Sequence, residues 1–280
     1  MSRLKLLVFF ICCHIITLTS FSYKSVAICN FNFDLHSDKN SGGPSDKDDI
    51  VTKLFSRFLP KPSDIGLTRF DQQSRPENFP CVKDRWATAL VGDTPDILLI
   101  RQTLANTNLE TRPLQLAYSA NRDGWNAAKF HASVDKRGPA VVLARSISGG
   151  VFGGYNPTGW VNYGEYRGSI AAFLFVFPDG DTKRRPIKLA KIGGAGLAQI
   201  DDGSGPKFGS EGLTIPLERS NPKLVRSKLG IYYENMPNGK RSLLPKALPQ
   251  DELTELLVFV GIYGSGEKIP YSDAIPFALN

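Results

Sequence analysis

The chain has 280 residues, enough for one large domain or two small ones, and 41% of them are hydrophobic and 22% charged. This composition excludes a disordered chain, and the 26 glycines and 19 prolines, which have no collagen-like period, indicate many turns between short strands. The formal net charge is +7, but Arg3, Lys5 and Lys24 supply three of these charges within residues 1–27, which contain no acid, so the remainder carries +4. A charge of +4 does not by itself predict a nucleic-acid partner.

Residues 1–27 have the three parts of a secretory signal. Arg3 and Lys5 form a charged start, Leu6 to Phe21 is mostly apolar, and Ser25-Val26-Ala27 places small residues where cleavage needs them. An uncleaved anchor and a buried helix are the alternatives for this segment. We therefore expect the chain to enter the endomembrane or secretory route, with a cytosolic location as the alternative. No other segment approaches the 18 apolar residues of a membrane span.

The elements that follow begin with helices. Residues 28–47 have the composition of a linker, and apolar residues at helical spacing predict an amphipathic helix from Asp48 to Leu59. Residues 60–93 are rich in proline and predict irregular structure. Thr94 and Pro95 are typical of a helix start and predict a second helix to about Leu104.

A third helix is predicted from Ala127 to about Asp135, with Asn126 as its cap and Gly138-Pro139 after its end. The chain then changes to strand patterns. Residues 140–145 and 151–155 predict a hairpin, 170–177 a strand covered on both faces, 187–192 its return strand after a turn at 178–181, and 256–263 a last strand. With no alternation of strand and helix after residue 138, the fold class is α+β, an antiparallel β-sandwich flanked by short helices, with an N-terminal helical extension.

Cysteine and histidine are scarce. Cys12, Cys13, Cys29 and Cys81 contain no C-x-x-C pair, and the three histidines cannot complete a zinc site at any usual spacing. A Cys29–Cys81 disulfide is conceivable in an oxidising compartment. For Cys81 we favour an inert thiol over a nucleophile, since only Lys83 is adjacent, and for His131 a structural or surface role over a catalytic base.

The remaining polar patterns fail the tests for known sites. The glycine runs do not form a phosphate loop, and Asp179 and Asp181 do not begin a calcium loop. A hydrolase-like enzyme of unrecognised class, using Asp201, Asp202 or Glu211, is the alternative function, although we favour solvated roles for the adjacent pair. Lys183, Arg184, Arg185, Lys188 and Lys191 form the only dense basic patch, which we interpret as a solvated rim. No catalytic, cofactor-binding or metal-binding residue is assigned.

An ordered set of short motifs from Leu114 to Gly261 resembles the TLDc domain (the TBC- and LysM-associated domain) of eukaryotic oxidation-resistance proteins. The set runs through Leu116-Ala117-Tyr118-Ser119, Arg122-Asp123-Gly124-Trp125 and Val151 to Tyr155. The motif residues to which we assign structural roles are Asp123, Gly124, Phe130, Gly138, Pro139, Phe152, Gly153, Gly154, Tyr155, Phe173, Phe175, Gly193, Gly194 and Gly196. The residues from Asp48 and the ending 269–280 resemble the plant branch of the family. Tyr232 to Leu244 departs from the pattern, because the usual threonine-phenylalanine-asparagine-proline stretch is missing there.

The resemblance implies a sandwich of antiparallel sheets, protection against oxidative damage, and binding to the peripheral sector of the vacuolar proton-pumping ATPase. It implies no catalytic set and no cofactor. Together with the patterns above, it divides the chain into a leader (1–27), a linker (28–47), a helical and irregular extension (48–113), a TLDc-like domain (114–263) and a C-terminal tail (264–280). These family roles are cytosolic, whereas the leader predicts the secretory route. A secreted domain that has lost the pump partner is therefore a further alternative.

Overall fold

A computed structural model describes residues 75–162 and 164–272 of the chain, all within the unit Pro62–Asn280. The predicted leader, the linker and the helix from Asp48 to Leu59 lie outside these residues, and so does Cys29. Among the described residues, no helix is long and apolar enough to cross a membrane.

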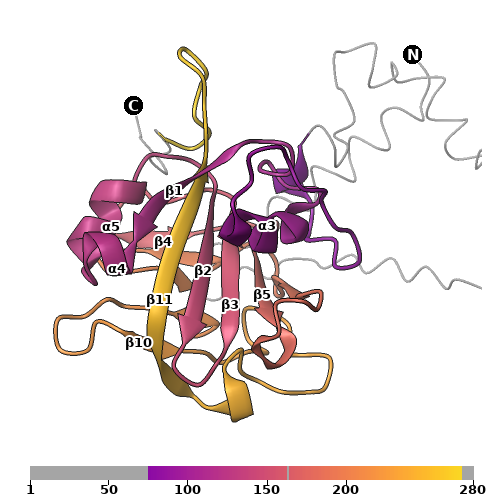
Figure 1. The fold of residues 1–280 in the computed structure, drawn as a ribbon, viewed down its shortest axis with the longest axis vertical. Coiled ribbons are helices and arrows are strands. Elements are labelled where there is room, and N and C mark those ends of the chain that lie inside the picture. The colour runs from indigo at the N-terminus through magenta and orange to yellow at the C-terminus, as the bar shows by residue number, and fades with distance from the viewer. Residues whose placement is uncertain (1–74, 163, 273–280) are drawn as a thin grey trace, which may run out of the picture. The chain divides into compact units, whose positions relative to one another are not determined.

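Two antiparallel sheets, joined by one long strand, make up most of the structure (Figure 1). The first sheet contains β1 (Leu114–Ser119), β2 (Ala140–Ser146), β3 (Val151–Asn156), β5 (Phe173–Phe177), β6 (Ile187–Ala190) and most of β11 (Gln250–Gly261). The second contains β4 (Glu165–Arg167), β7 (Gln199–Asp201), β8 (Lys207–Phe208), β9 (Leu213–Thr214) and β10 (Leu224–Arg226). The order β4-β7-β8-β9-β10-β11-β2-β3-β5-β6 is continuous, and β1 pairs with the other side of β11.

Strand β11 belongs to both sheets. Its first residues, Gln250 to Glu252, pair with β10, whereas Leu253 to Val260 pair with β2. The register shifts between Leu253 and Glu255, which is an irregularity of the kind that bends a strand. One strand can therefore cross from one layer to the other. Every strand pairing is antiparallel, so the predicted α+β sandwich is confirmed.

Short helices flank the sheets, and α3 and α5 begin where their capping residues predict. α3 (Pro95–Arg101) starts after Thr94, whose side chain accepts a hydrogen bond from the backbone N–H of Ile97, and continues as a 3-10 turn to Leu104. α4 (Ala120–Asp123) follows β1 directly. α5 (Ala127–Val134) starts after Asn126, whose side chain accepts from the N–H of Lys129. Both predicted helices within the described residues are confirmed.

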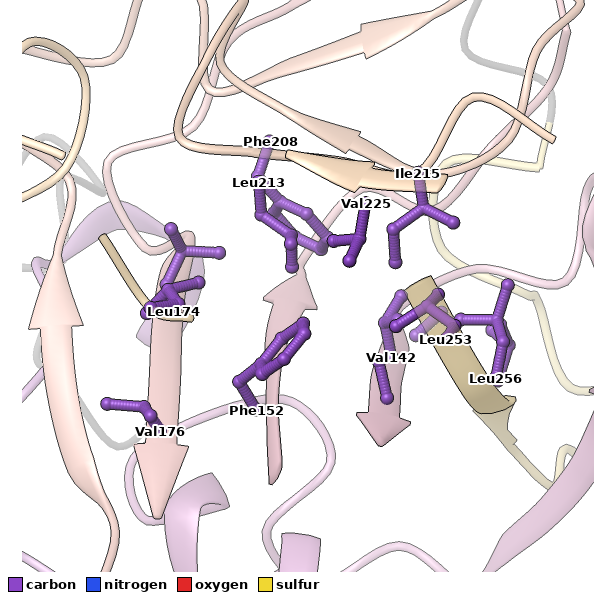
Figure 2. Close-up of a cluster of buried hydrophobic side chains, with 14 of the residues drawn as sticks. Val142, Phe152, Leu174, Val176, Phe208, Leu213, Ile215, Val225, Leu253 and Leu256 are labelled. Atoms are coloured by element: carbon purple, nitrogen blue, oxygen red, sulfur yellow. The ribbon is translucent and has the colours of Figure 1, made fainter. Parts of the chain in front are cut away.

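Two separate apolar layers cover the two faces of the first sheet. Between the sheets, Phe152, Leu174 and Val142 meet Phe208, Leu213 and Val225 of the second sheet (Figure 2). On the opposite face, a second cluster joins Phe173, Phe175 and Phe177 to Ile97 and Ile100 of α3. Residues of β5 thus alternate between the two layers, and all five are buried, which confirms the predicted strand covered on both faces.

Two glycines of β3 permit the close packing at the centre of this sheet. A Cβ at Gly153 would lie 1.9 Å from the carbonyl oxygen of Val142 and 2.6 Å from Cζ of Phe175, and one at Gly154 would lie 2.7 Å from Cζ of Phe208. The two glycines of the Val151–Tyr155 motif are therefore needed for packing on both faces of the sheet. A larger residue at Gly153 would displace Phe175 in one layer, and a larger residue at Gly154 would displace Phe208 in the other.

None of the five strands of the second sheet was predicted from the sequence, and β1 of the first sheet was missed as well. β7, β8, β9 and β10 have only two or three residues each, too few to produce the alternation that identifies a strand. Strand ends also differ: β5 begins at Phe173 instead of Ile170, β6 ends at Ala190 instead of Ile192, and β11 begins at Gln250 instead of Leu256. The first residues of β11, Gln-Asp-Glu, are polar, so they do not have the sequence pattern of a strand. They extend the strand because they pair with β10.

Candidate functional site

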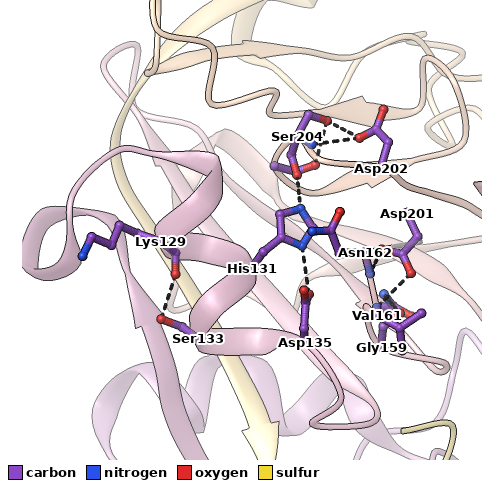
Figure 3. A network of polar contacts seen from close by, with 12 residues as sticks. Lys129, His131, Ser133, Asp135, Gly159, Val161, Asn162, Asp201, Asp202 and Ser204 are labelled. Atoms are coloured by element: carbon purple, nitrogen blue, oxygen red, sulfur yellow. Dashed lines mark hydrogen bonds and ion pairs between the residues drawn. The ribbon is translucent and has the colours of Figure 1, made fainter. Parts of the chain in front are cut away.

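His131 lies in a network of polar contacts that also contains Asp135, Asp201 and Ser204 (Figure 3). It lies on α5 and is only 5% exposed. Its Nδ1 is 2.8 Å from Oδ1 of Asp135, and its Nε2 is 2.7 Å from the carbonyl oxygen of Ser204. Because a carboxylate and a carbonyl can only accept, both ring nitrogens must donate, which requires the protonated imidazolium.

The pKa of His131 follows from these contacts. Burial favours the neutral ring, but the hydrogen bond to Asp135, the charges of Asp135 and Asp201 and the bond to Ser204 outweigh burial and raise the pKa above its ordinary value. A histidine held as a cation with both nitrogens donating cannot accept a proton. His131 therefore serves as a clasp between α5 and the loop after β7, and is not a general base in this conformation.

Asp201, the last residue of β7, is fully buried. Its two oxygens accept hydrogen bonds of 2.9 Å from the backbone N–H groups of Val161 and Asn162, and Arg167 of β4 lies 3.5 Å from Oδ2. Burial raises the pKa of this carboxyl, and the two backbone bonds and the charge of Arg167 offset part of that effect. The expectation of a solvated Asp201 is wrong, because the chain after Trp160 closes over the strand end.

Asp202 has different partners from its neighbour. Its Oδ2 forms a 2.7 Å ion pair with Lys207, and its Oδ1 accepts from the backbone N–H and the hydroxyl of Ser204. Burial acts to raise its pKa, but Lys207 and Ser204 reverse the direction and lower it. The two carboxyls are therefore occupied by different structural partners, whereas the two carboxyls of a glycosidase flank one scissile bond.

Glu211, the third acid considered, lies on a different part of the second sheet. It forms a 2.8 Å ion pair with Lys228 on the rim of a pocket of about 400 Å³ that also includes Arg226 and Arg241. Asp179 and Asp181 lie in the turn after β5, where Asp179 is paired with Arg184. Within residues 75–162 and 164–272, no three histidine, cysteine or acidic side chains gather as metal ligands.

Cys81 is half-buried and lies near Lys188, a charged residue that is far from it in sequence. Burial raises the pKa of its thiol to about 11, although Lys188 and Lys83 act to lower it. Lys83 is paired with Glu234 at 2.9 Å, and the ammonium of Lys188 donates to the carbonyl of Arg85 at 2.7 Å. At neutral pH this residue is a protonated thiol.

The basic patch from Lys183 to Lys191 is not one surface. Lys183, Arg184 and Arg185 are exposed, but Lys188 and Lys191 are buried at 3% and 7% exposure, so the interpretation of the whole patch as a solvated rim is wrong. Lys188 is the second residue of β6, and Lys191 directly follows the strand and pairs with Tyr233 in an isolated bridge. Lys188 lies 5.0 Å from the ring of Trp86, which is distant in sequence, and this contact stabilises an ammonium that burial disfavours.

The motif residues from β1 to α5 form a compact structural unit. Asp123 accepts from the backbone N–H of Ser119, and the carbonyl of Gly124 accepts from the hydroxyl of Tyr118 at 2.7 Å. Phe130 packs edge-on against Tyr118 and Trp160, at centroid distances of 5.6 and 5.2 Å. The motif therefore joins β1, α5 and the segment before β4.

The other motif residues occupy turns and close contacts. Gly138, which precedes Pro139, has φ +76°. A Cβ at Gly159 would lie 2.1 Å from the carbonyl oxygen of Gly138, so these two glycines are in close contact. Tyr155 packs against Phe173 at 5.3 Å. Gly193 and Gly194 have φ +71° and +78°, and a Cβ at either of them or at Gly196 would meet nothing within 4 Å, as expected for an open turn.

The chain matches the model of a known domain family. The model of the TLDc domain family matches residues 91–236, just over half of the chain, and spans the elements from α3 to β10 but not β11. This chain belongs to the TLDc domain family. The match confirms the resemblance found in the sequence, and it links the chain to a family associated with resistance to oxidative stress. No curated protein matches the chain significantly.

Proposed function

We propose that this TLDc protein acts as a non-enzymatic interaction domain in protection against oxidative damage, and that its partner is the peripheral sector of the vacuolar proton-pumping ATPase. The observation that supports the proposal is the family match across residues 91–236. The choice of this partner rests on the resemblance to oxidation-resistance proteins alone. The polar groups considered for catalysis have structural partners. His131 connects α5 to the loop after β7, and Asp201 of β7 contacts Asn162 and Arg167 of β4.

Affinity purification of the tagged protein, followed by identification of bound pump subunits, tests the partner. We expect peripheral subunits of the pump to be recovered with the wild-type chain. A Phe175→Ala variant, which removes a buried ring from the first sheet, is the matched control for recovery that depends on the folded domain. Recovery of no pump subunit by the wild-type chain would reject this partner.

The enzyme alternative is tested by a choice of variants that the structure refines. Asp201 is unsuitable, because loss of its two backbone contacts would change stability as well as chemistry. Asp202→Asn and Glu211→Gln leave the buried contacts in place, since these acids are paired with Lys207 and Lys228 near the surface. Unchanged protection of cells against hydrogen peroxide by both variants would eliminate an enzyme that uses either acid.

The leader pattern of residues 1–27 favours one other candidate, a secreted or lumenal TLDc domain without the pump partner. We propose that this leader directs the chain into the endomembrane system. A fluorescent protein fused after Asn280 should then enter that system, and deletion of residues 1–27 should return the fusion to the cytosol. Diffuse cytosolic signal from the full-length fusion would reject the leader and favour the pump-binding function.

A further inference from the structure

A cavity of about 500 Å³ lies where two hairpin turns of the first sheet meet the segment before β11. The turn between β2 and β3 contacts the turn after β5 so closely that a Cβ at Gly180 would lie 2.0 Å from the carbonyl oxygen of Gly149. Gly150 similarly abuts the ring of Pro245, which a Cβ would approach to 2.8 Å. Three backbone turns in direct contact make a preformed wall, as in most small-molecule sites, and the volume is within the range of such sites.

The inner part of this cavity is apolar and continuous with the core. Val176 of β5, Met236 and Leu243 line it, and all three also belong to the cluster between the sheets. Met236 and Leu243 come from the segment between β10 and β11. An apolar group in the cavity would therefore extend the inter-sheet core.

The rim of the cavity is cationic. Arg184, Lys240 and Lys246 line it, and Asp179 is the single acid among the lining residues. Asp179 is already paired with Arg184, at 3.2 Å. The ammonium of Lys240 has no hydrogen-bond or ion-pair partner among the residues that the structure describes, although Lys240 is half-buried. Burial lowers its pKa against the opposing charge of Asp179, so an anion beside it would stabilise the protonated form.

We propose that this cavity binds a small amphipathic carboxylate, whose apolar tail packs against Val176, Met236 and Leu243 and whose carboxylate pairs with Lys240. The apolar interior requires the tail, and the unpaired ammonium at the mouth requires a negative head. Asp179 disfavours a doubly charged phosphate relative to a single carboxylate. This inference does not depend on the identity of a protein partner, because the cavity takes a ligand of small-molecule size.

The methionine content of the chain provides a direct probe. Met236 is the only methionine besides Met1, so labelling with ε-13C-methionine gives one methyl resonance from the cavity wall and at most one other. Titration of the full chain with decanoate should shift the Met236 resonance saturably with one-site stoichiometry. Decanol, which lacks the charge, and acetate, which lacks the tail, should each bind at least about tenfold more weakly.

Lys240→Gln removes the charge and should weaken decanoate binding by roughly tenfold, whereas Lys240→Arg should keep most of it. Lys183→Gln is the matched control, because Lys183 is exposed in the same turn region but does not line the cavity. The Met236 resonance of each unliganded variant verifies that its core is intact. No saturable shift with decanoate, equal affinity in Lys240→Gln and wild type, or equal affinity for decanol would each overturn the proposal.

Discussion

The two sheets of the sandwich are built in different ways. Strands of the first sheet have four to twelve residues, and β2, β3 and β5 are almost entirely buried. Strands of the second sheet have two or three residues each, and loops make up much of that layer. The first sheet is therefore buried along whole strands, whereas the second contributes single apolar residues from short strands and loops to the core.

Polar side chains compensate in the second sheet by bonding to the backbone of neighbouring loops. Tyr233 donates from its buried hydroxyl to the carbonyl of Ala198 at 2.6 Å. Ser227 donates to the carbonyl of Gly212 and accepts from the N–H of Leu243. Asp201 and His131 make further contacts of this kind. Both layers bury apolar side chains, but the second adds a set of buried hydrogen bonds to the backbone of its loops, so the two sheets should respond to different perturbations.

The largest effect is expected in the first sheet. Phe175→Ala should reduce the free energy of unfolding by roughly 3–5 kcal/mol, the range for a buried phenylalanine, because its ring is fully buried against α3. Chemical denaturation of the variant measures the change. Tyr166→Ala in β4, where the side chain is 58% exposed, is the control and should change stability little. Similar losses for the two variants would contradict the burial of Phe175 between the first sheet and α3.

Gly153→Ala should cost about 1–3 kcal/mol or more, because the added methyl group would meet the backbone of β2. Gly196→Ala is its matched control: a Cβ there meets nothing within 4 Å and its φ is not positive. Thermal unfolding of the pair separates close packing from the general preference for alanine. Equal melting temperatures would show that β3 does not approach β2 as closely as described.

Asp201→Asn tests the polar layer and should cost about 1–3 kcal/mol, because an amide can accept only one of the two backbone hydrogen bonds. Its NH₂ group would face the N–H that lost its partner. Asp202→Asn, whose side chain is only partly buried, should cost less. Denaturation of both variants at the same pH decides this, and a larger loss for Asp202→Asn would reverse the assignment.

The smallest effect concerns pH. Folding raises the pKa of His131, so the folded state binds this proton more tightly than the unfolded chain does. The resulting stability is complete below the ordinary value of 6.5 and is lost as the pH rises through the higher folded value. Wild-type stability, measured by denaturation from pH 6 upward, should contain a decrease on the order of 1 kcal/mol that His131→Gln lacks. An identical pH profile in the variant would show that the imidazolium clasp does not form.

Part of the candidate site was accessible from sequence and part was not. The scarcity of histidine directed attention to His131, and its helix was predicted from Asn126. Its partner Ser204 is 73 residues away and is joined by a backbone carbonyl, a group that carries no residue-specific signal. The same holds for Lys188, whose burial depends on Trp86 and on the register of β6. Charged runs in sequence do not reveal which members face the interior.

The sequence by itself determined the family, the two capped helices and the apolar parts of β2, β3, β5, β6 and β11, because those features depend on local spacing: a capping side chain three residues before the N–H that it accepts from, or a run or alternation of apolar residues. Only the tertiary structure decided the second sheet, the burial of Asp201 and Lys188 and the cavity beside Lys240. These depend on segments far apart in the chain, and short strands have no period of their own. Their positions are fixed by the packing of the two layers and not by the residues next to them.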